Sequence, residues 1–136
     1  VISTPQKIAL NDARKGVSMF KKENINVPVL GIIENMAYFT PKELPENKYY
    51  LFGKEGAKNL SLDLRIPFLG EIPIIQSVRE AADFGRPAAM QESTISEEIF
   101  KKVSKNMLSQ LLIRNKELPE TEIVKITTMS GCFSQK

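Results

Sequence analysis

The feature that most constrains the fold is a short apolar run at residues 29–33, VLGII, which stops abruptly at Glu34 and Asn35. The run is rich in Val and Ile and follows Pro28. Apolar runs of this length are typical of strands that are buried on both faces, and such strands occur in parallel sheets covered by helices. The chain is therefore expected to form an α/β sheet that binds ligands just beyond the carboxyl ends of its strands.

Asn35 lies at the expected carboxyl end of this strand. A side-chain amide donates and accepts hydrogen bonds at once, which suits recognition of the edge of a base or of another polar ligand. Asn is also a common turn residue, so the position also fits the simple start of a turn.

Strand and helix patterns alternate along the first half of the chain. An apolar segment at residues 1–3 precedes Thr4, a good helix-capping residue, and a helix is predicted over residues 5–22. A short helix is predicted over residues 53–64 and a second buried strand, PFLGEI, over residues 67–72. This order predicts parallel strands joined by right-handed crossovers.

A long helix is predicted over residues 94–114, beginning at a capping box formed by Thr94 and Glu97. Apolar residues at helical spacing form one wide stripe on it: Ile95, Ile99, Val103, Met107 and Leu111. The wide aliphatic stripe favours packing against the core, and binding to a membrane surface is the alternative.

Two further segments have no such regular pattern. Residues 40–52 contain two prolines among charged residues and end in an aromatic cluster, which favours a functional or interface loop. Residues 121–128 are rich in Ile, Val and Thr and predict an edge strand, followed by a loose tail. We expect residues 1–116 to form one structural unit, and residues 117–136 to form the edge strand and flexible tail.

Composition excludes several kinds of site. There is no His and only one Cys, Cys132, so neither an intrachain disulfide nor Ser-His or Cys-His catalysis is available. One cysteine per chain could still supply a metal ligand in a symmetric dimer, which leaves Cys132 as a candidate. The net charge of +3 is spread along the chain and no apolar run approaches the ~20 residues of a membrane span. We therefore expect a cytoplasmic protein that binds neither nucleic acid nor membrane.

No complete catalytic site is visible in the sequence. The G-x-x-x-x-G-K-[ST] phosphate loop is absent, and no pair of carboxylates stands out as an acid and base. The chain also opens at Val1 directly within an apolar strand pattern. We therefore expect a fragment of a longer chain, inactive as an enzyme on its own.

Four segments together resemble a known family. In order, VISTPQKIALNDARKGVSMF, VPVLGIIENMAYF, YLFGKEGAKNL and IPFLGEIPIIQSVREAADFGRPA resemble the carboxyl-terminal half of Mrp/ApbC-type P-loop ATPases, in the deviant-Walker group of MinD and ParA. The resemblance covers about residues 1–113. It implies part of a doubly wound, mostly parallel sheet with helices on both faces, whose other half carries the phosphate loop.

The resemblance also implies a function and a site. Asn35 matches the asparagine that contacts adenine, and Pro73 and Ile74 match the segment on the other side of the base. The full-length protein is then expected to be an ATPase that uses ATP and Mg²⁺, forms a homodimer and delivers iron–sulfur clusters to apo-protein clients.

One departure from the family concerns the cluster. Many members carry a Cys-x-x-Cys pair just after the ENM-x-Y-F segment, and here that stretch reads TPKELPENKYYLFG. Cluster binding in the usual way is therefore not expected, and Cys132 is the only candidate substitute ligand. Two alternative functions remain open at this point: a MinD- or ParA-like positioning ATPase, and a non-enzymatic α/β binding module.

Overall fold

The computed structural model of the chain describes residues 1–120. The predicted edge strand at residues 121–128, the tail and Cys132 lie outside the described residues. The elements follow in the order β1 (Ile2–Ser3), α1 (Lys7–Phe20), β2 (Ile32–Phe39), α2 (Gly56–Leu64), β3 (Phe68–Ile74), α3 (Gln76–Asp83), the 3-10 helix η1 (Ala88–Met90) and α4 (Ile95–Glu117).

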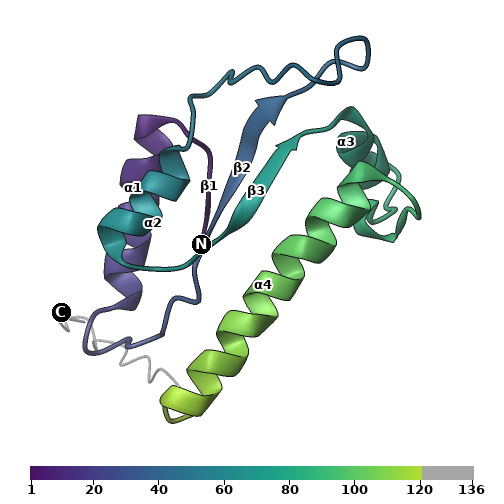
Figure 1. Cartoon of the computed structure of the whole chain (residues 1–136). Coiled ribbons are helices and arrows are strands. Elements are labelled where there is room, and N and C mark those ends of the chain that lie inside the picture. The colour runs from purple at the N-terminus through teal and green to yellow at the C-terminus, as the bar shows by residue number, and fades with distance from the viewer. Residues whose placement is uncertain (121–136) are drawn as a thin grey trace, which may run out of the picture.

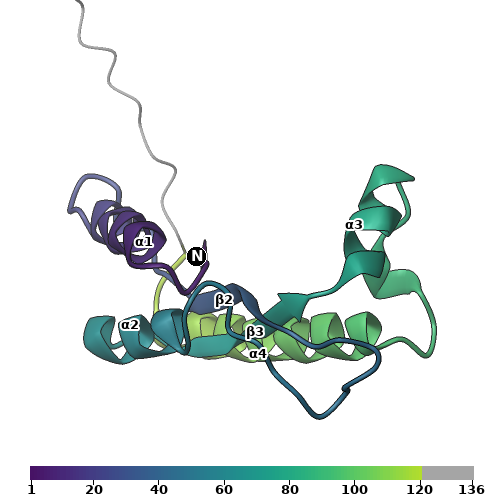
Figure 2. The ribbon, with the colours of Figure 1, turned by 90° about the horizontal axis from the view of Figure 1, so that it is seen from above.

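The three strands form one parallel sheet in the order β1-β2-β3. Helices α1 and α2 pack together on one side of this sheet, and α4 lies on the other side along β3 (Figure 1). Helix α3 follows β3 at its carboxyl end and projects away from the sheet (Figure 2). The predicted α/β fold, with a parallel sheet between helices, is confirmed.

The core lies between the sheet and the α1–α2 pair. Its central residues are almost fully buried: Ala13, Ile32, Ala57 and Leu60. Gly56 allows the close approach of α2 to the start of α1, because a Cβ atom at this position would lie 2.5 Å from the Pro5 carbonyl oxygen. The amino end of α2 is therefore pressed against the segment that leads into α1.

The predicted bounds of the central strand are wrong. β2 begins at Ile32 and continues through Glu34 and Asn35 to Phe39. The strand begins late because its neighbours begin late: Ile33 pairs with Ile2, and Ile32 with Phe68. It continues through Glu34 because that buried carboxylate is satisfied by a backbone N–H of α2.

The predicted start of the first helix is also wrong. α1 begins at Lys7 rather than at Pro5, and Gln6, in an extended conformation, occupies the N-cap position without a side-chain bond. The Thr4 hydroxyl is buried and has no hydrogen-bond partner among the described residues. The extended conformation of Gln6 moves the start of the helix beyond the reach of Thr4 as a cap.

Helix α4 confirms its predicted capping box and only part of its predicted packing. The Glu97 N–H donates to the Thr94 hydroxyl at 3.2 Å, and the Glu97 carboxylate accepts from the Ser93 N–H at 2.8 Å. Of the predicted apolar stripe, Val103 is buried, whereas Ile95, Met107 and Leu111 are exposed. The middle of α4 thus packs on β3, and much of its apolar surface stays open. No helix in residues 1–120 combines the length and apolar character needed to cross a membrane.

Candidate functional site

The site predicted from sequence lies where β2 and β3 approach their carboxyl ends. In the ladder Glu34 pairs with Glu71 and Asn35 with Ile72, and the next pair is Phe39 with Ile74. The regular pairing therefore breaks directly after Asn35. Asn35 is thus not the end of β2, as the sequence suggested, but the last residue of its regular part.

A tight turn at Asn35 causes this break. Met36 has a positive φ of 55°, an unfavourable conformation for a residue with a side chain. The Met36 N–H donates to Oδ1 of Asn35 at 3.0 Å. Among the described residues the amide nitrogen of Asn35 has no hydrogen-bond partner, so its two N–H donors are available to a ligand.

Pro73 and Ile74 follow directly on β3 after Ile72, the ladder partner of Asn35. Because Asn35 pairs with Ile72, the next residue of β3 toward its carboxyl end is Pro73, which is buried. Contrary to prediction, both residues belong to β3 rather than to a following loop. A proline is accommodated there because β3 is an edge strand and the ladder skips from Ile72 to Ile74.

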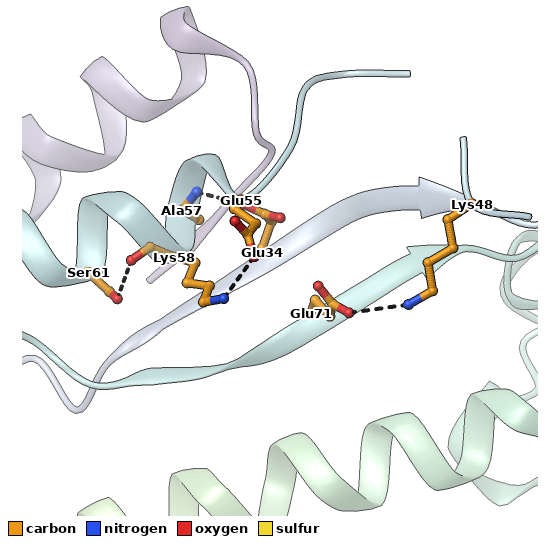
Figure 3. Close-up of polar contacts among 7 residues, drawn as sticks. All are labelled: Glu34, Lys48, Glu55, Ala57, Lys58, Ser61 and Glu71. Atoms are coloured by element: carbon orange, nitrogen blue, oxygen red, sulfur yellow. Dashed lines mark hydrogen bonds and ion pairs between the residues drawn. The ribbon is translucent and has the colours of Figure 1, made fainter. Parts of the chain in front are cut away.

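Sequence reasoning missed Glu34, the most buried ionisable side chain near this site. Glu34 is 1% exposed, and its Oε2 accepts a hydrogen bond from the Ala57 N–H at 2.6 Å (Figure 3). Burial raises the pKa of Glu34; its backbone bonds to Ala57 and Lys58 act in the opposite direction, and the nearby Glu71 and Glu55 raise it further. Its only signal in the sequence is a charged residue directly after an apolar run, with the aromatic residues Tyr38 and Phe39 a few positions later.

Residues 40–52 are irregular, as predicted, but the irregular segment continues to Glu55 because α2 begins at Gly56 rather than at the predicted Gly53; we call residues 40–55 the 40–55 loop. Its base is closed by two backbone bonds between Phe39 and Tyr49, at 2.9 and 2.8 Å. Lys48 lies 4.0 Å from the centre of the Tyr38 ring and 3.9 Å from the Glu71 carboxylate. Its aromatic residues thus fold back on the body of the protein, with Tyr50 edge-on to Tyr38 at 6.2 Å between ring centres.

The described residues offer no metal centre. Within residues 1–120 no three His, Cys, Asp or Glu side chains come together in a way that could hold a metal ion. The 40–55 loop contains no cysteine. Nothing in the described part of the chain therefore fits a cluster.

A hollow lies outside the predicted site. It has a volume of about 650 Å³, opens between α1 and α2, and has Lys7, Lys54 and the ion-paired Arg14 and Asp63 in its lining. None of Asn35, Pro73 and Ile74 lines it. It is a separate place at which a small molecule could bind.

Known proteins similar to this chain are named for the transfer of iron or of iron-sulfur clusters. A family model described as ParA, NUBPL iron-transfer P-loop NTPase, matches residues 1–108. The chain is 42% identical over 118 residues to the iron-sulfur cluster transfer protein NUBPL of Dictyostelium discoideum, covering 86% of this chain and 36% of that protein. It is also 42% identical over 92 residues to an iron-sulfur cluster carrier protein of Synechocystis, covering 68% of this chain and 26% of that protein.

A solved structure shares the fold. The nucleotide-binding protein of Archaeoglobus fulgidus, in complex with ADP, matches with a TM-score of 0.53 and 35% identity, over 62% of this chain and 35% of that chain. This chain thus spans only about a quarter to a third of the length of these proteins.

Proposed function

The chain belongs to the family of NUBPL iron-transfer P-loop NTPases, and we propose that it is the adenine-binding and dimerisation half of an ATP-binding iron–sulfur cluster carrier. Membership confirms the resemblance to Mrp/ApbC-type proteins. The proposed division is that residues 1–116 form the carboxyl-terminal half of a P-loop ATPase domain and residues 117–136 an edge strand and tail. Helix α4 ends at Glu117, next to this boundary.

The observation that carries the proposal is the juxtaposition of Asn35 and Pro73 on adjacent parallel strands. The free amide donors of Asn35 suit the ring nitrogens of adenine, which are hydrogen-bond acceptors. On the neighbouring strand Pro73 is buried, so the apolar surface against which a flat ring can lie comes from the partly exposed Ile74. Two neighbouring strand ends thus offer one polar and one apolar contact to the same base.

The phosphates require residues that this chain does not have. No phosphate loop occurs in the sequence. When ATP is bound, Mg²⁺ and a phosphate loop supply the charge that stabilises phosphoryl transfer. We therefore assign base recognition to this chain and expect it to hydrolyse no ATP on its own.

The open edge of β1 is the proposed position of the missing strand. β1 is an edge strand of a parallel sheet, and Ile2 is 63% exposed there. Parallel sheets are normally covered by helices and continued by further strands. We propose that the strand of the phosphate loop pairs with this edge of β1.

Homodimer formation and delivery of clusters to apo-protein clients complete the proposal. The exposed apolar residues of α4, among them Leu108 and Leu112, supply surface that a second subunit can cover. We expect concentration-dependent self-association in sedimentation, and a strictly monomeric chain at high concentration contradicts this part. The usual cysteine pair is absent, so any cluster needs other ligands, for which Cys132 is the candidate. The cytoplasmic location stays a prediction.

The test of base recognition is calorimetric titration of the chain with ADP and with GDP. We expect ADP to bind and Asn35→Ala to weaken this binding about tenfold, since one or two hydrogen bonds to the base are lost. Asn24→Ala, at an exposed position after α1, is the matched control and leaves the affinity unchanged. Equal binding of ADP by Asn35→Ala contradicts the proposed site.

The MinD- or ParA-like alternative has a separate test. Helix α4 has exposed apolar residues beside lysines, the combination that a membrane-surface helix needs. Sedimentation of the chain with anionic phospholipid vesicles supports this alternative, and the absence of binding supports the carrier.

A further inference from the structure

Two carboxylates, the buried Glu34 and the partly exposed Glu71, attach the 40–55 loop to the sheet one residue before the base site. Glu34 and Glu71 are ladder partners on β2 and β3, and Figure 3 shows Glu34 beside the start of α2 and Glu71 toward Lys48. The next pair of the ladder is Asn35 with Ile72. Glu34 binds the backbone of Ala57, just after the loop, and Glu71 pairs with Lys48 within the loop. The loop is therefore fixed at two points to the strands that carry the base-binding residues.

The two attachments differ in strength. The Glu34 bond is short and buried, and it joins two residues that are 1% and 0% exposed. Next to it, the start of α2 approaches the segment before α1 closely, because a Cβ atom at Gly56 would lie 2.5 Å from the Pro5 carbonyl oxygen. The Lys48–Glu71 pair is longer, at 3.9 Å, and its side chains are almost half exposed, so water and salt weaken it. The end of the loop near α2 is thus rigid, and the part near Lys48 is the easier to move.

The base site contains a turn, Asn35–Met36, whose conformation can change. Oδ1 of Asn35 accepts the Met36 N–H, and this bond holds Met36 at its unfavourable positive φ. The exocyclic amino group of an adenine is a donor that competes for the same oxygen. If Oδ1 turns to the base, the Asn35–Met36 turn loses its bond and Met36 can return to an ordinary strand conformation. Phe39, three residues later, closes the base of the loop through Tyr49.

We propose that the Asn35–Met36 turn is a switch through which a bound adenine nucleotide moves the 40–55 loop, and that Glu34 is the positioning residue that anchors the far end of the loop. This inference rests on the proposed adenine site. It assigns to the loop a response to nucleotide that needs no cysteine in the loop. The mobile part is the side that carries Lys48 and Tyr49, and the fixed part is the start of α2.

The chain contains its own reporters for this motion. It has no Trp and three Tyr, and all three lie at the base of the loop: Tyr38, Tyr49 and Tyr50. Replacement of tyrosine by 3-fluorotyrosine in the full chain gives three ¹⁹F NMR signals, assigned by Tyr→Phe variants. Titration with ADP is expected to shift the Tyr49 and Tyr38 signals, with the same saturation as the calorimetric binding curve.

Variants of Glu34 test the anchor. Glu34→Gln keeps an oxygen that accepts the Ala57 N–H and is expected to respond as the unchanged chain does. Glu34→Ala loses the bond, shifts the Tyr50 signal before any nucleotide is added, and reduces the ADP-induced shifts at least twofold. Glu98→Ala, at an exposed position in the first turn of α4, is the matched control and changes neither.

Each result decides a defined part of the inference. ADP binding without movement of any tyrosine signal overturns the switch and leaves the proposed function intact. Unchanged signals in a folded Glu34→Ala chain overturn the anchor. Failure of the unchanged chain to bind ADP overturns the proposed function and the switch together, while the nucleotide-free spectra still decide on the anchor. If Glu34→Ala does not fold, Glu34→Asp serves instead: its shorter side chain moves the carboxylate away from the Ala57 N–H and is expected to shift the Tyr50 signal, and no shift overturns the anchor.

Discussion

The two sides of the sheet differ in how completely they are packed. On the α1–α2 side, Ala57 and Ile32 are fully buried and Leu60 is 4% exposed. On the α4 side, Val103 is buried, but Leu108 and Leu112 are 55% and 63% exposed. The residue types are equally apolar, so the difference lies in what covers them. Within residues 1–120, one side is a finished protein core, whereas the other leaves apolar side chains of α4 exposed.

A pair of leucine substitutions tests this difference most strongly. Leu60→Ala leaves a cavity in the finished core and is expected to lower the free energy of unfolding by about 2–5 kcal/mol. Leu112→Ala removes the same atoms from an exposed position and is expected to change it by less than about 0.5 kcal/mol. Urea unfolding of both variants gives the two values. Equal losses at the two positions mean that α4 is already packed in the isolated chain.

A pair of glycine substitutions probes the same core at its tightest point. Gly56→Ala places a Cβ atom 2.5 Å from the Pro5 carbonyl oxygen and 2.8 Å from Leu10, and is expected to cost about 1–3 kcal/mol. Gly16→Ala, within α1, meets nothing within 4 Å and is expected to stabilise the chain by about 0.5–1 kcal/mol. Thermal or urea unfolding distinguishes the opposite signs. A harmless Gly56→Ala contradicts the close contact of α2 with the start of α1.

The smallest expected effect is the pH dependence of stability that comes from Glu34, the buried carboxylate that bonds to the start of α2. The pKa of Glu34 is raised above its ordinary value of 4.5, chiefly by burial, so the folded chain holds this proton more tightly than the unfolded chain. The groups that face Glu34 are Ala57, Lys58 and Glu55 at the start of α2 and Glu71 on β3. Between 4.5 and the raised pKa, the contribution of Glu34 to stability therefore falls as pH rises.

Comparison with Glu34→Gln isolates this contribution, since glutamine does not titrate. The unfolding free energy of the unchanged chain minus that of the variant is expected to fall as pH rises above 4.5. Urea unfolding across about pH 4 to 8 measures it. Leu112→Ala, which alters no titratable group, serves as the pH-independent control. If this difference in unfolding free energy rises with pH, the hydrogen bond from Ala57 lowers the pKa of Glu34 more than burial raises it.

Local pattern predicted the sheet because residues 29–33 and 67–72 are apolar runs of strand length, and parallel strands bring Asn35 and Pro73 together. The local pattern placed the end of β2 too early because a charged residue normally ends a buried strand. Glu34 is tolerated only through the Ala57 N–H, 23 residues further along the chain. Such a bond has no local signal.

The remaining differences have the same origin. The positive φ of Met36 could not be predicted, because methionine carries no preference for that conformation. The stripe on α4 correctly marked an apolar face, but spacing alone does not tell which part of the face the sheet covers. In both places tertiary contacts decide what the local sequence leaves open.

The most direct test of the central claim is photolabelling with 8-azido-ADP, followed by identification of the modified peptides. The proposed adenine site predicts labels within residues 35–39 and 72–76, lost in Asn35→Ala and in excess ADP. The hollow between α1 and α2 is the rival, since Lys7, Arg14 and Lys54 could attract the phosphates there. Labels confined to the lining of that hollow, with none near Asn35, contradict the account.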